Sequence, residues 1–131
     1  MIALDTNVLV RFLVADDPAQ NEAASKLIAS AIRTEERLYL SDVVLCEAVW
    51  VLTTSYGVPR REVAQHLGEL LRAKHLDIQA CDGLARALAA FAQGRGDFAD
   101  YVIRERATAR GCSAVATFDR VLLKEPGFKK P

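Results

Sequence analysis

The chain has 131 residues, 51% apolar and 26% charged, a balance typical of one folded domain rather than a disordered chain. Its 17 basic and 17 acidic residues cancel, so composition alone does not indicate a nucleic-acid binder. No apolar run approaches the roughly 20 residues that span a bilayer, and the first residues lack the basic start of a signal peptide. We expect a single domain over residues 1–131 that does not contact a membrane.

Cysteines and histidines exclude several kinds of site. Cys46, Cys81 and Cys112 are odd in number and far apart, so they predict neither a disulfide framework nor a zinc motif. We expect buried free thiols in a reducing cytoplasm. His66 and His75 are the only histidines and have polar neighbours, which does not favour a histidine acid–base pair or a histidine-rich zinc site.

The first third of the chain predicts two strands with two helices between them. An apolar start over residues 2–4 ends on Asp5 and suits a buried strand. A short helix is expected over residues 7–14. Asp16-Asp17-Pro18 then forms a turn that caps a second helix, which reaches about residue 33. Residues 37–40 are predicted to form the second strand.

The middle of the chain is mostly helical. Ser41 or Asp42 caps a third helix, and Pro59 opens a fourth. A short strand and an Ala- and Leu-rich helix follow. The expected elements are a helix ending near residues 56–57, a helix over 59–74, a strand over 76–79 and a helix over 82–93.

Two glycines, Gly94 and Gly96, bracket a break before the last elements. Asp97 starts a helix to about residue 111, residues 113–117 form a buried strand, and Asp119 begins a final helical turn. Basic residues become frequent in this region: they are Arg104, Arg106, Arg110, Arg120, Lys124, Lys129 and Lys130. Strands that alternate with helices predict an α/β fold with a parallel sheet covered on both faces.

Glu47 is the most informative single residue. It lies in Val43-Val44-Leu45-Cys46-Glu47-Ala48-Val49-Trp50, so its helix is expected to be buried on nearly all faces. A buried carboxylate needs a partner cation, because leaving it unpaired costs several kcal/mol. Three interpretations follow: a functional acid, a salt bridge to a buried arginine, or a side chain that reaches solvent at the helix edge.

Other carboxylates lie at the ends of elements. Asp5 closes the first strand and Asp119 follows the last one; each also fits a helix cap. Asp97 and Asp100 are three apart at a helix start, where Asp97 fits either a cap or a ligand and Asp100 enters the core. Thr117 is placed to donate a hydrogen bond to a site acid. Because ligand sites of open α/β sheets lie beyond the carboxyl ends of the strands, acids from different strands can meet there.

Four acids at such positions predict a cation site. Asp5, Glu47, Asp100 and Asp119 would repel one another if they were close, and a hard divalent cation relieves that repulsion. Oxygen-only ligands suit Mg²⁺, with Mn²⁺ as a substitute. Mg²⁺ also binds substrate phosphates, so the set favours metal-assisted hydrolysis of phosphodiesters.

In these residues the chain resembles the PIN-domain ribonucleases, most closely the toxins of VapBC toxin–antitoxin pairs. The resemblance covers essentially the whole chain and rests on four motifs in order. They are Ile2-Ala3-Leu4-Asp5-Thr6-Asn7, the segment from Leu40-Ser41 to Glu47, Asp97-Phe98-Ala99-Asp100-Tyr101-Val102-Ile103, and Ala116-Thr117-Phe118-Asp119. Arg104-Glu105-Arg106 departs from the family, where small apolar residues are more usual.

The resemblance implies a three-layer α/β/α sandwich with a central, mainly parallel sheet. It also implies a Mg²⁺-dependent endoribonuclease, with RNA as substrate, that forms a homodimer and pairs with an antitoxin protein. Asp5, Glu47, Asp100 and Asp119 are then the catalytic and metal-binding residues. Asn7, Ser41, Asp97 and Thr117 take supporting positions beside them.

Alternative interpretations come from other classes. A haloacid-dehalogenase-type phosphohydrolase also opens with a strand ending in Asp, but its second acid is replaced here by Asn7. A receiver-type phosphoacceptor also has an acidic pocket, but this chain lacks the paired early acids of that class and its lysine after the last strand. A non-catalytic binding module with the same fold is the third alternative. The third predicted helix has more apolar surface than one face of a small sheet needs. This surface predicts either a dimer interface or packing within the core, and it comes from Val49, Trp50, Leu52 and Tyr56.

Overall fold

Five short strands form two separate parallel sheets in the computed structural model, which describes residues 1–131. In the first sheet β2 (Leu38–Tyr39) lies between β1 (Ile2–Ala3) and β3 (Leu76–Asp77). In the second, β4 (Val115–Ala116) pairs with β5 (Phe128–Lys129). The parallel α/β class predicted from the sequence is confirmed. The strands do not form one central sheet, however, and β5 was not predicted.

Six α-helices connect and cover the strands, and their starts follow the expected capping signals. The Asp17 carboxylate accepts a hydrogen bond from the Gln20 N–H at 3.1 Å, and the Ser41 hydroxyl accepts one from the Val44 N–H at 3.2 Å. A short 3₁₀ turn, η1 (Leu122–Lys124), stands where a final helical turn was expected. The helices are α1 (Thr6–Leu13), α2 (Pro18–Thr34), α3 (Asp42–Thr54), α4 (Arg60–Leu71), α5 (Cys81–Gln93) and α6 (Phe98–Ala109).

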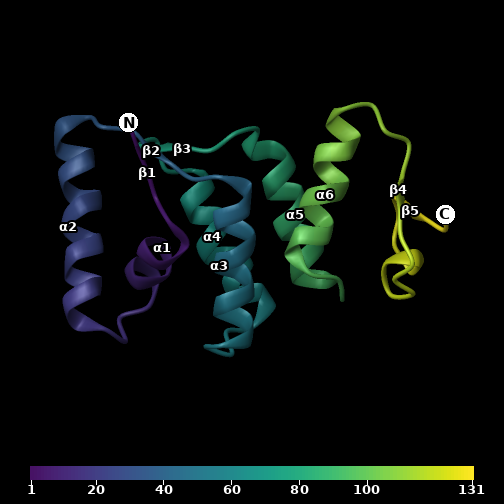
Figure 1. Ribbon diagram of the computed structural model, residues 1–131, viewed down its shortest axis with the longest axis horizontal. Coiled ribbons are helices and arrows are strands. Elements are labelled where there is room, and N and C mark those ends of the chain that lie inside the picture. The colour runs from purple at the N-terminus through teal and green to yellow at the C-terminus, as the bar shows by residue number, and fades with distance from the viewer.

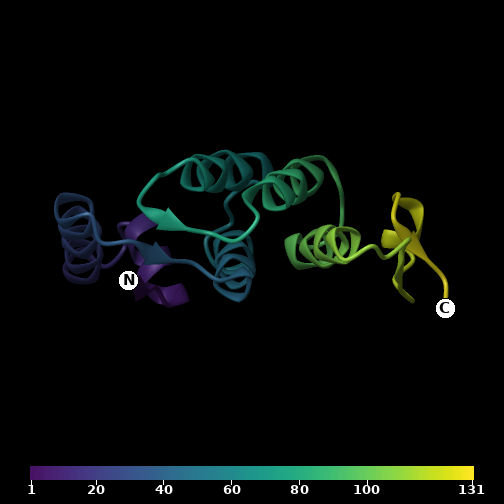
Figure 2. The ribbon, with the colours of Figure 1, turned by 90° about the horizontal axis from the view of Figure 1, so that it is seen from above.

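The elements are spread along one long axis (Figure 1). Helix α2 lies at one end beside α1 and the first sheet, α3 to α6 occupy the middle, and β4 and β5 lie at the other end. The view from above shows the same order, with β4 and β5 beyond α6 and far from β1 (Figure 2). The two sheets therefore stand at opposite sides of the α5–α6 pair.

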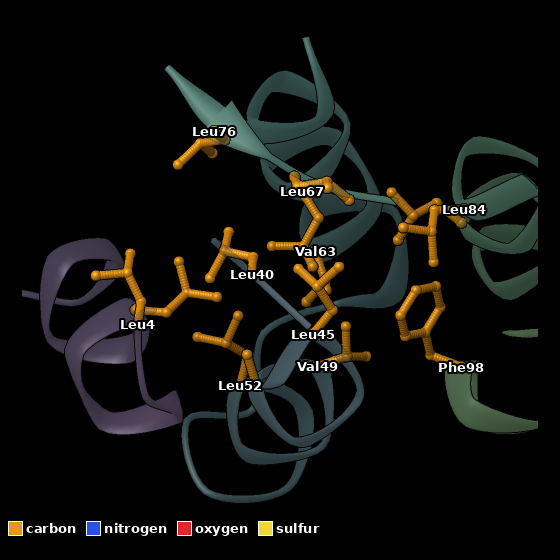
Figure 3. Packing of buried hydrophobic residues seen from close by; sticks show 14 of the residues in the cluster. Leu4, Leu40, Leu45, Val49, Leu52, Val63, Leu67, Leu76, Leu84 and Phe98 are labelled. Carbon is orange, nitrogen blue, oxygen red and sulfur yellow. The ribbon is translucent and has the colours of Figure 1, made fainter. Parts of the chain in front are cut away.

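One apolar core joins the first sheet to the helices. Leu4 and Leu40 follow β1 and β2 and are nearly inaccessible, as are Leu45 and Val49 on α3. Figure 3 shows these side chains converging with residues of α4, α5 and α6. Burying each such side chain contributes roughly 1.5–3 kcal/mol. This packing fixes α3 between the first sheet and α6.

The side chains of β1 and β4, which were predicted to be buried, are exposed or half-buried. Ile2 is 44% exposed and Ala3 is also exposed in β1, while Ala116 is exposed and Val115 half-buried in β4. Their apolar sequences are typical of strands covered on both faces. Because β4 and β5 do not join β1, these strands lack the neighbours that such sequences normally pack against.

Arg60 at the start of α4 holds the turn between α5 and α6. Its guanidinium donates hydrogen bonds to the carbonyls of Phe91, Gly94 and Gly96 at 2.7–3.1 Å and lies 4.3 Å from the Phe91 ring centroid. The turn is also tight, since a Cβ on Gly96 would lie 2.7 Å from the Leu122 side chain. Both contacts position the first turn of α6.

We predict that Arg60→Ala destabilises the fold by roughly 2 kcal/mol, because several charge-assisted hydrogen bonds and a cation–π contact are lost together. Arg60→Lys restores only part of this stability, because an ammonium lacks the planar face that lies over the Phe91 ring and the second nitrogen that donates to the Arg95 carbonyl. Denaturant unfolding measures the effect. Arg61→Ala is the matched control, because Arg61 is exposed and makes no ion pair. An equal loss in both variants would contradict this role of Arg60.

Candidate metal centre

Asp5 and Glu47 are brought near each other at the end of β1. Asp5 precedes α1 as its N-cap residue but makes no side-chain capping bond, so its exposed carboxylate is free. The next residue, Thr6, is 8% exposed and donates a hydroxyl hydrogen bond of 2.7 Å to Glu47 Oε2. This bond ties the carboxyl end of β1 to the middle of α3. Thr6 was not singled out from the sequence, and its place directly after Asp5 was the available signal.

The prediction that Glu47 is buried was wrong. Glu47 is exposed, and it shares one stripe of α3 with Val43 and Trp50, which are 66% and 60% exposed. Val43, Glu47 and Trp50 are spaced by four and three residues, so they lie on one face of α3. Because two of the three are apolar, the sequence did not indicate that this face is exposed. Glu47 also forms no salt bridge, which excludes the interpretation of a buried ion pair.

Asp97 and Asp100 lie together at the start of α6. Asp97 is the N-cap residue, and its backbone N–H donates to Asp100 Oδ2 at 2.9 Å. Burial raises the pKa of Asp100 above its usual value; the Asp97 N–H opposes the shift, while the negative charges of Asp97, Asp119 and Glu125 add to it. Asp100 therefore lies within electrostatic reach of Asp119.

Asp119 follows β4 in an exposed loop. Its Oδ1 accepts hydrogen bonds from the N–H groups of Val121 at 2.8 Å and Leu122 at 3.4 Å, so one oxygen caps the η1 turn. Thr117 was expected to donate to a site acid, but its hydroxyl instead accepts from the Asp119 N–H at 3.0 Å. The Thr117 hydroxyl therefore orients the Asp119 backbone. The second carboxylate oxygen of Asp119, Oδ2, makes no hydrogen bond.

The four acids thus form two pairs, Asp5 with Glu47 and Asp100 with Asp119. No group of three or more acidic, histidine or cysteine side chains gathers closely enough to hold a metal within one chain. A groove of about 490 Å³ between α3 and α6 is lined by Glu47 and by Ala99, the neighbour of Asp100. Among the supporting residues, Ser41 caps the helix that carries Glu47, and Asn7 lines a cleft between α1 and α2.

A basic groove adjoins Asp119. Its volume is about 690 Å³, and its lining includes Arg120, Lys124 and Lys130 without any acidic residue. None of the three cations forms an ion pair or a side-chain hydrogen bond. Phe118, which is 87% exposed, lines the same groove. The sequence showed the basic residues but not that an exposed aromatic side chain stands among them.

Residues 2–129 match the model of the PIN domain family. The chain belongs to this family. No curated protein matches the sequence. PIN domains are generally metal-dependent nucleases, and carboxylates at the carboxyl ends of parallel strands fit that chemistry. The match over nearly the whole chain disfavours the haloacid-dehalogenase and receiver alternatives. No helix of this PIN domain combines the length and apolarity needed to cross a bilayer.

We predict that Asp100→Asn leaves the metal-free PIN domain as stable as the wild type or more stable at pH 7. A carboxyl whose folded pKa is raised disfavours folding when ionised; this penalty is complete above the raised pKa and vanishes below the ordinary aspartate value. The amide oxygen still accepts from the Asp97 N–H, so the cap is kept. Thermal melts at pH 7 and pH 3 measure the difference.

The control for this prediction is Asp82→Asn, an exposed acid in the first turn of α5. It should lose a few tenths of a kcal/mol, because it removes a favourable charge at a helix N-terminus. A large loss of stability for Asp100→Asn at pH 7 would instead mark Asp100 as a structural residue.

Proposed function

We propose that this PIN domain is a Mg²⁺-dependent endoribonuclease, and that it is the toxin of a type II toxin–antitoxin pair of the VapBC kind. Residues 1–131 act as one nuclease domain. Asp5, Glu47, Asp100 and Asp119 hold the cation, and Mn²⁺ substitutes for Mg²⁺. The toxin role and the antitoxin partner rest on the resemblance of the four motifs to that group.

The observation that carries the proposal is that all four acids lack a positive partner. None of the chain's ion pairs includes Asp5, Glu47, Asp100 or Asp119. Each carboxylate also keeps at least one oxygen without a hydrogen bond from the protein. A missing ion pair alone does not distinguish these four acids from surface acids such as Glu69. Because the chain is a PIN domain and the four acids match its motifs, their free oxygens favour an external cation.

The donor chemistry fits a hard divalent cation, since every candidate ligand is a carboxylate oxygen and Mg²⁺ needs only one or two of them. When bound, such a cation neutralises phosphate charge and activates water for hydrolysis. The protein's own task is to position the carboxylates. Thr6 fixes one oxygen of Glu47, the Asp97 N–H fixes one of Asp100, and the η1 turn fixes one of Asp119.

RNA as substrate is supported by the basic groove beside Asp119. Three unpaired cations attract a phosphate backbone, and the exposed Phe118 ring offers a surface on which a base can stack. Stacking on an aromatic side chain requires an unpaired base. The groove therefore fits a single-stranded segment that leads to the acids.

A second candidate is a PIN-fold binding module without catalysis. It is favoured by one observation, namely that a single chain gathers no group of three acids. Such a module binds RNA through the basic groove but does not cleave it in any divalent cation. Cleavage assays therefore separate the two candidates.

RNA cleavage should vanish in EDTA and return with Mg²⁺ or Mn²⁺. Glu47→Gln should lower the rate on the order of 100-fold or more, because several kcal/mol of charge stabilisation depend on the cation. Glu69→Gln is the matched control, since Glu69 is exposed and makes no ion pair. Gel analysis of a labelled RNA measures both. Full activity after exhaustive chelation would exclude the metal mechanism.

A second prediction concerns the basic groove. Lys124→Ala with Lys130→Ala should weaken binding of a single-stranded RNA and flatten its salt dependence by about 0.7 in log–log slope per phosphate contact. Phe118→Leu should cost roughly 1–3 kcal/mol of binding and leave the slope unchanged, because stacking releases no counterions. Fluorescence anisotropy in EDTA measures binding without cleavage.

The control pair is Lys26→Ala with Lys74→Ala, which removes the same charge outside the groove. If this pair weakens binding as much as the groove pair does, net charge rather than the groove holds the RNA.

A further inference from the structure

The C-terminal segment, residues 113–131, is held to the rest of the chain by few contacts. In both views it lies beyond α6 and apart from the other helices (Figures 1 and 2). Three hydrogen bonds join it to earlier residues, and two of them end on Oε1 of Glu125. Their donors are the Tyr101 hydroxyl at 2.8 Å and the Arg95 N–H at 3.4 Å, while the third bond comes from Arg104. Glu125 is therefore the main polar attachment of the segment.

The Tyr101 side chain is placed for this bond by burial. It is 0% exposed, and its hydroxyl also accepts a hydrogen bond of 3.0 Å from the Gly96 N–H. The close approach requires glycine at position 94, because a Cβ on Gly94 would overlap the Tyr101 hydroxyl and lie 2.7 Å from Glu125 Oε1. Burial and the bond to Glu125 both raise the pKa of Tyr101, so its hydroxyl keeps its proton and donates at neutral pH.

The two ends of this bond lie next to two of the candidate acids. Tyr101 directly follows Asp100 on α6. Glu125 ends the tight turn that Asp119 begins: the Glu125 N–H donates to the Leu122 carbonyl at 2.9 Å, and the Leu122 N–H donates to Asp119 Oδ1 at 3.4 Å. The bond between Tyr101 and Glu125 thus connects the turn that carries Asp119 to the helix that carries Asp100.

We propose that Tyr101 and Glu125 are positioning residues of the cation site: their hydrogen bond holds the Asp119 turn at a fixed place relative to Asp100. This inference rests on the proposed function, in which both acids bind the cation. Mg²⁺ requires ligands in near-ideal octahedral geometry, so its affinity depends on how firmly the protein fixes their spacing. Burial raises the pKa of Asp100 and the charge of Asp119 adds to the shift, which places the two carboxyls within electrostatic reach.

The basic groove provides a readout that separates positioning from folding. All of its lining residues lie within residues 117–131, on one side of the bond. If the bond is lost while β4, β5 and η1 keep their own contacts, the groove stays intact. RNA binding in EDTA should then persist while cation binding weakens. Local unfolding of the segment would instead weaken both.

The attachment of the segment is tested in the metal-free protein by hydrogen exchange. In Tyr101→Phe and in Glu125→Ala, the amides of Leu122 and Leu123, which donate to Asp119, should exchange on the order of 10-fold faster, because one bond to a charged group is lost. Amides within α3 should keep their wild-type rates. Tyr56→Phe is the matched control, since the Tyr56 hydroxyl also donates to a carboxylate, that of Asp16 at 2.7 Å.

The effect on the site is tested by titration with Mn²⁺, followed through the magnetic resonance signal of the free ion. The Kd should rise on the order of 10-fold in Tyr101→Phe and in Glu125→Ala, and no further in the double variant, because both changes remove the same bond. Glu125→Gln should bind more tightly than Glu125→Ala. Both of these variants lose the charge, but the amide oxygen still accepts from the Tyr101 hydroxyl. Tyr56→Phe should bind Mn²⁺ like the wild type.

The outcomes separate this inference from the proposed function. Wild-type Mn²⁺ affinity in folded Tyr101→Phe and Glu125→Ala, or an equal loss of RNA binding in EDTA, would overturn the positioning role. Unchanged exchange of the Leu122 and Leu123 amides in both variants would overturn it as well. A wild type that binds no Mn²⁺ would contradict the proposed function, while hydrogen exchange still decides whether Tyr101 and Glu125 hold the Asp119 turn.

Discussion

The guanidinium of Arg106 determines where α6 lies, and the positions of both sheets follow from α6. It donates two hydrogen bonds to Asp42 at the start of α3 and further ones to the carbonyls of Gln79 and Ala80 before α5. One side chain thus joins three elements that are far apart in sequence. A lysine cannot replace it, since a single ammonium does not span a carboxylate and two carbonyls.

This contact also accounts for the charged segment Arg104-Glu105-Arg106, where small apolar residues are more usual in the family. Arg106 is neutralised by Asp42, while Arg104 donates to the Pro126 carbonyl at 3.1 Å and lies 5.2 Å from the Tyr101 ring centroid. Glu105 faces Arg86 of α5 at 3.3 Å. The three charges therefore attach α6 to its neighbours, and none of them neutralises a candidate site acid.

Secondary structure could be predicted from the sequence where it depends on interactions between residues that are close in the chain. Asp17-Pro18 and Ser41 begin helices because their side chains and backbone geometry act within one turn. Burial of Glu47 and of β1 was wrongly predicted, because exposure depends on which element arrives from elsewhere. The same limit hid β5, whose Phe128-Lys129 is too short to show a period, and the separation of the acids into two pairs.

The net charge of the chain is zero, but the basic side chains of the groove and the four candidate acids lie in separate places. If Arg120, Lys124 or Lys130 stood among the acids, they would form ion pairs, and neither set would be free for a ligand. Instead the three cations line a groove without acids, and the four carboxylates lack cations. Charges kept apart in this way stay free for external partners, which in the proposed nuclease are a phosphate chain on one side and a divalent cation on the other. Because Asp119 lies between Phe118 and Arg120 in the sequence, the proposed nuclease would use the same loop for both sites, with a bound phosphate next to Asp119.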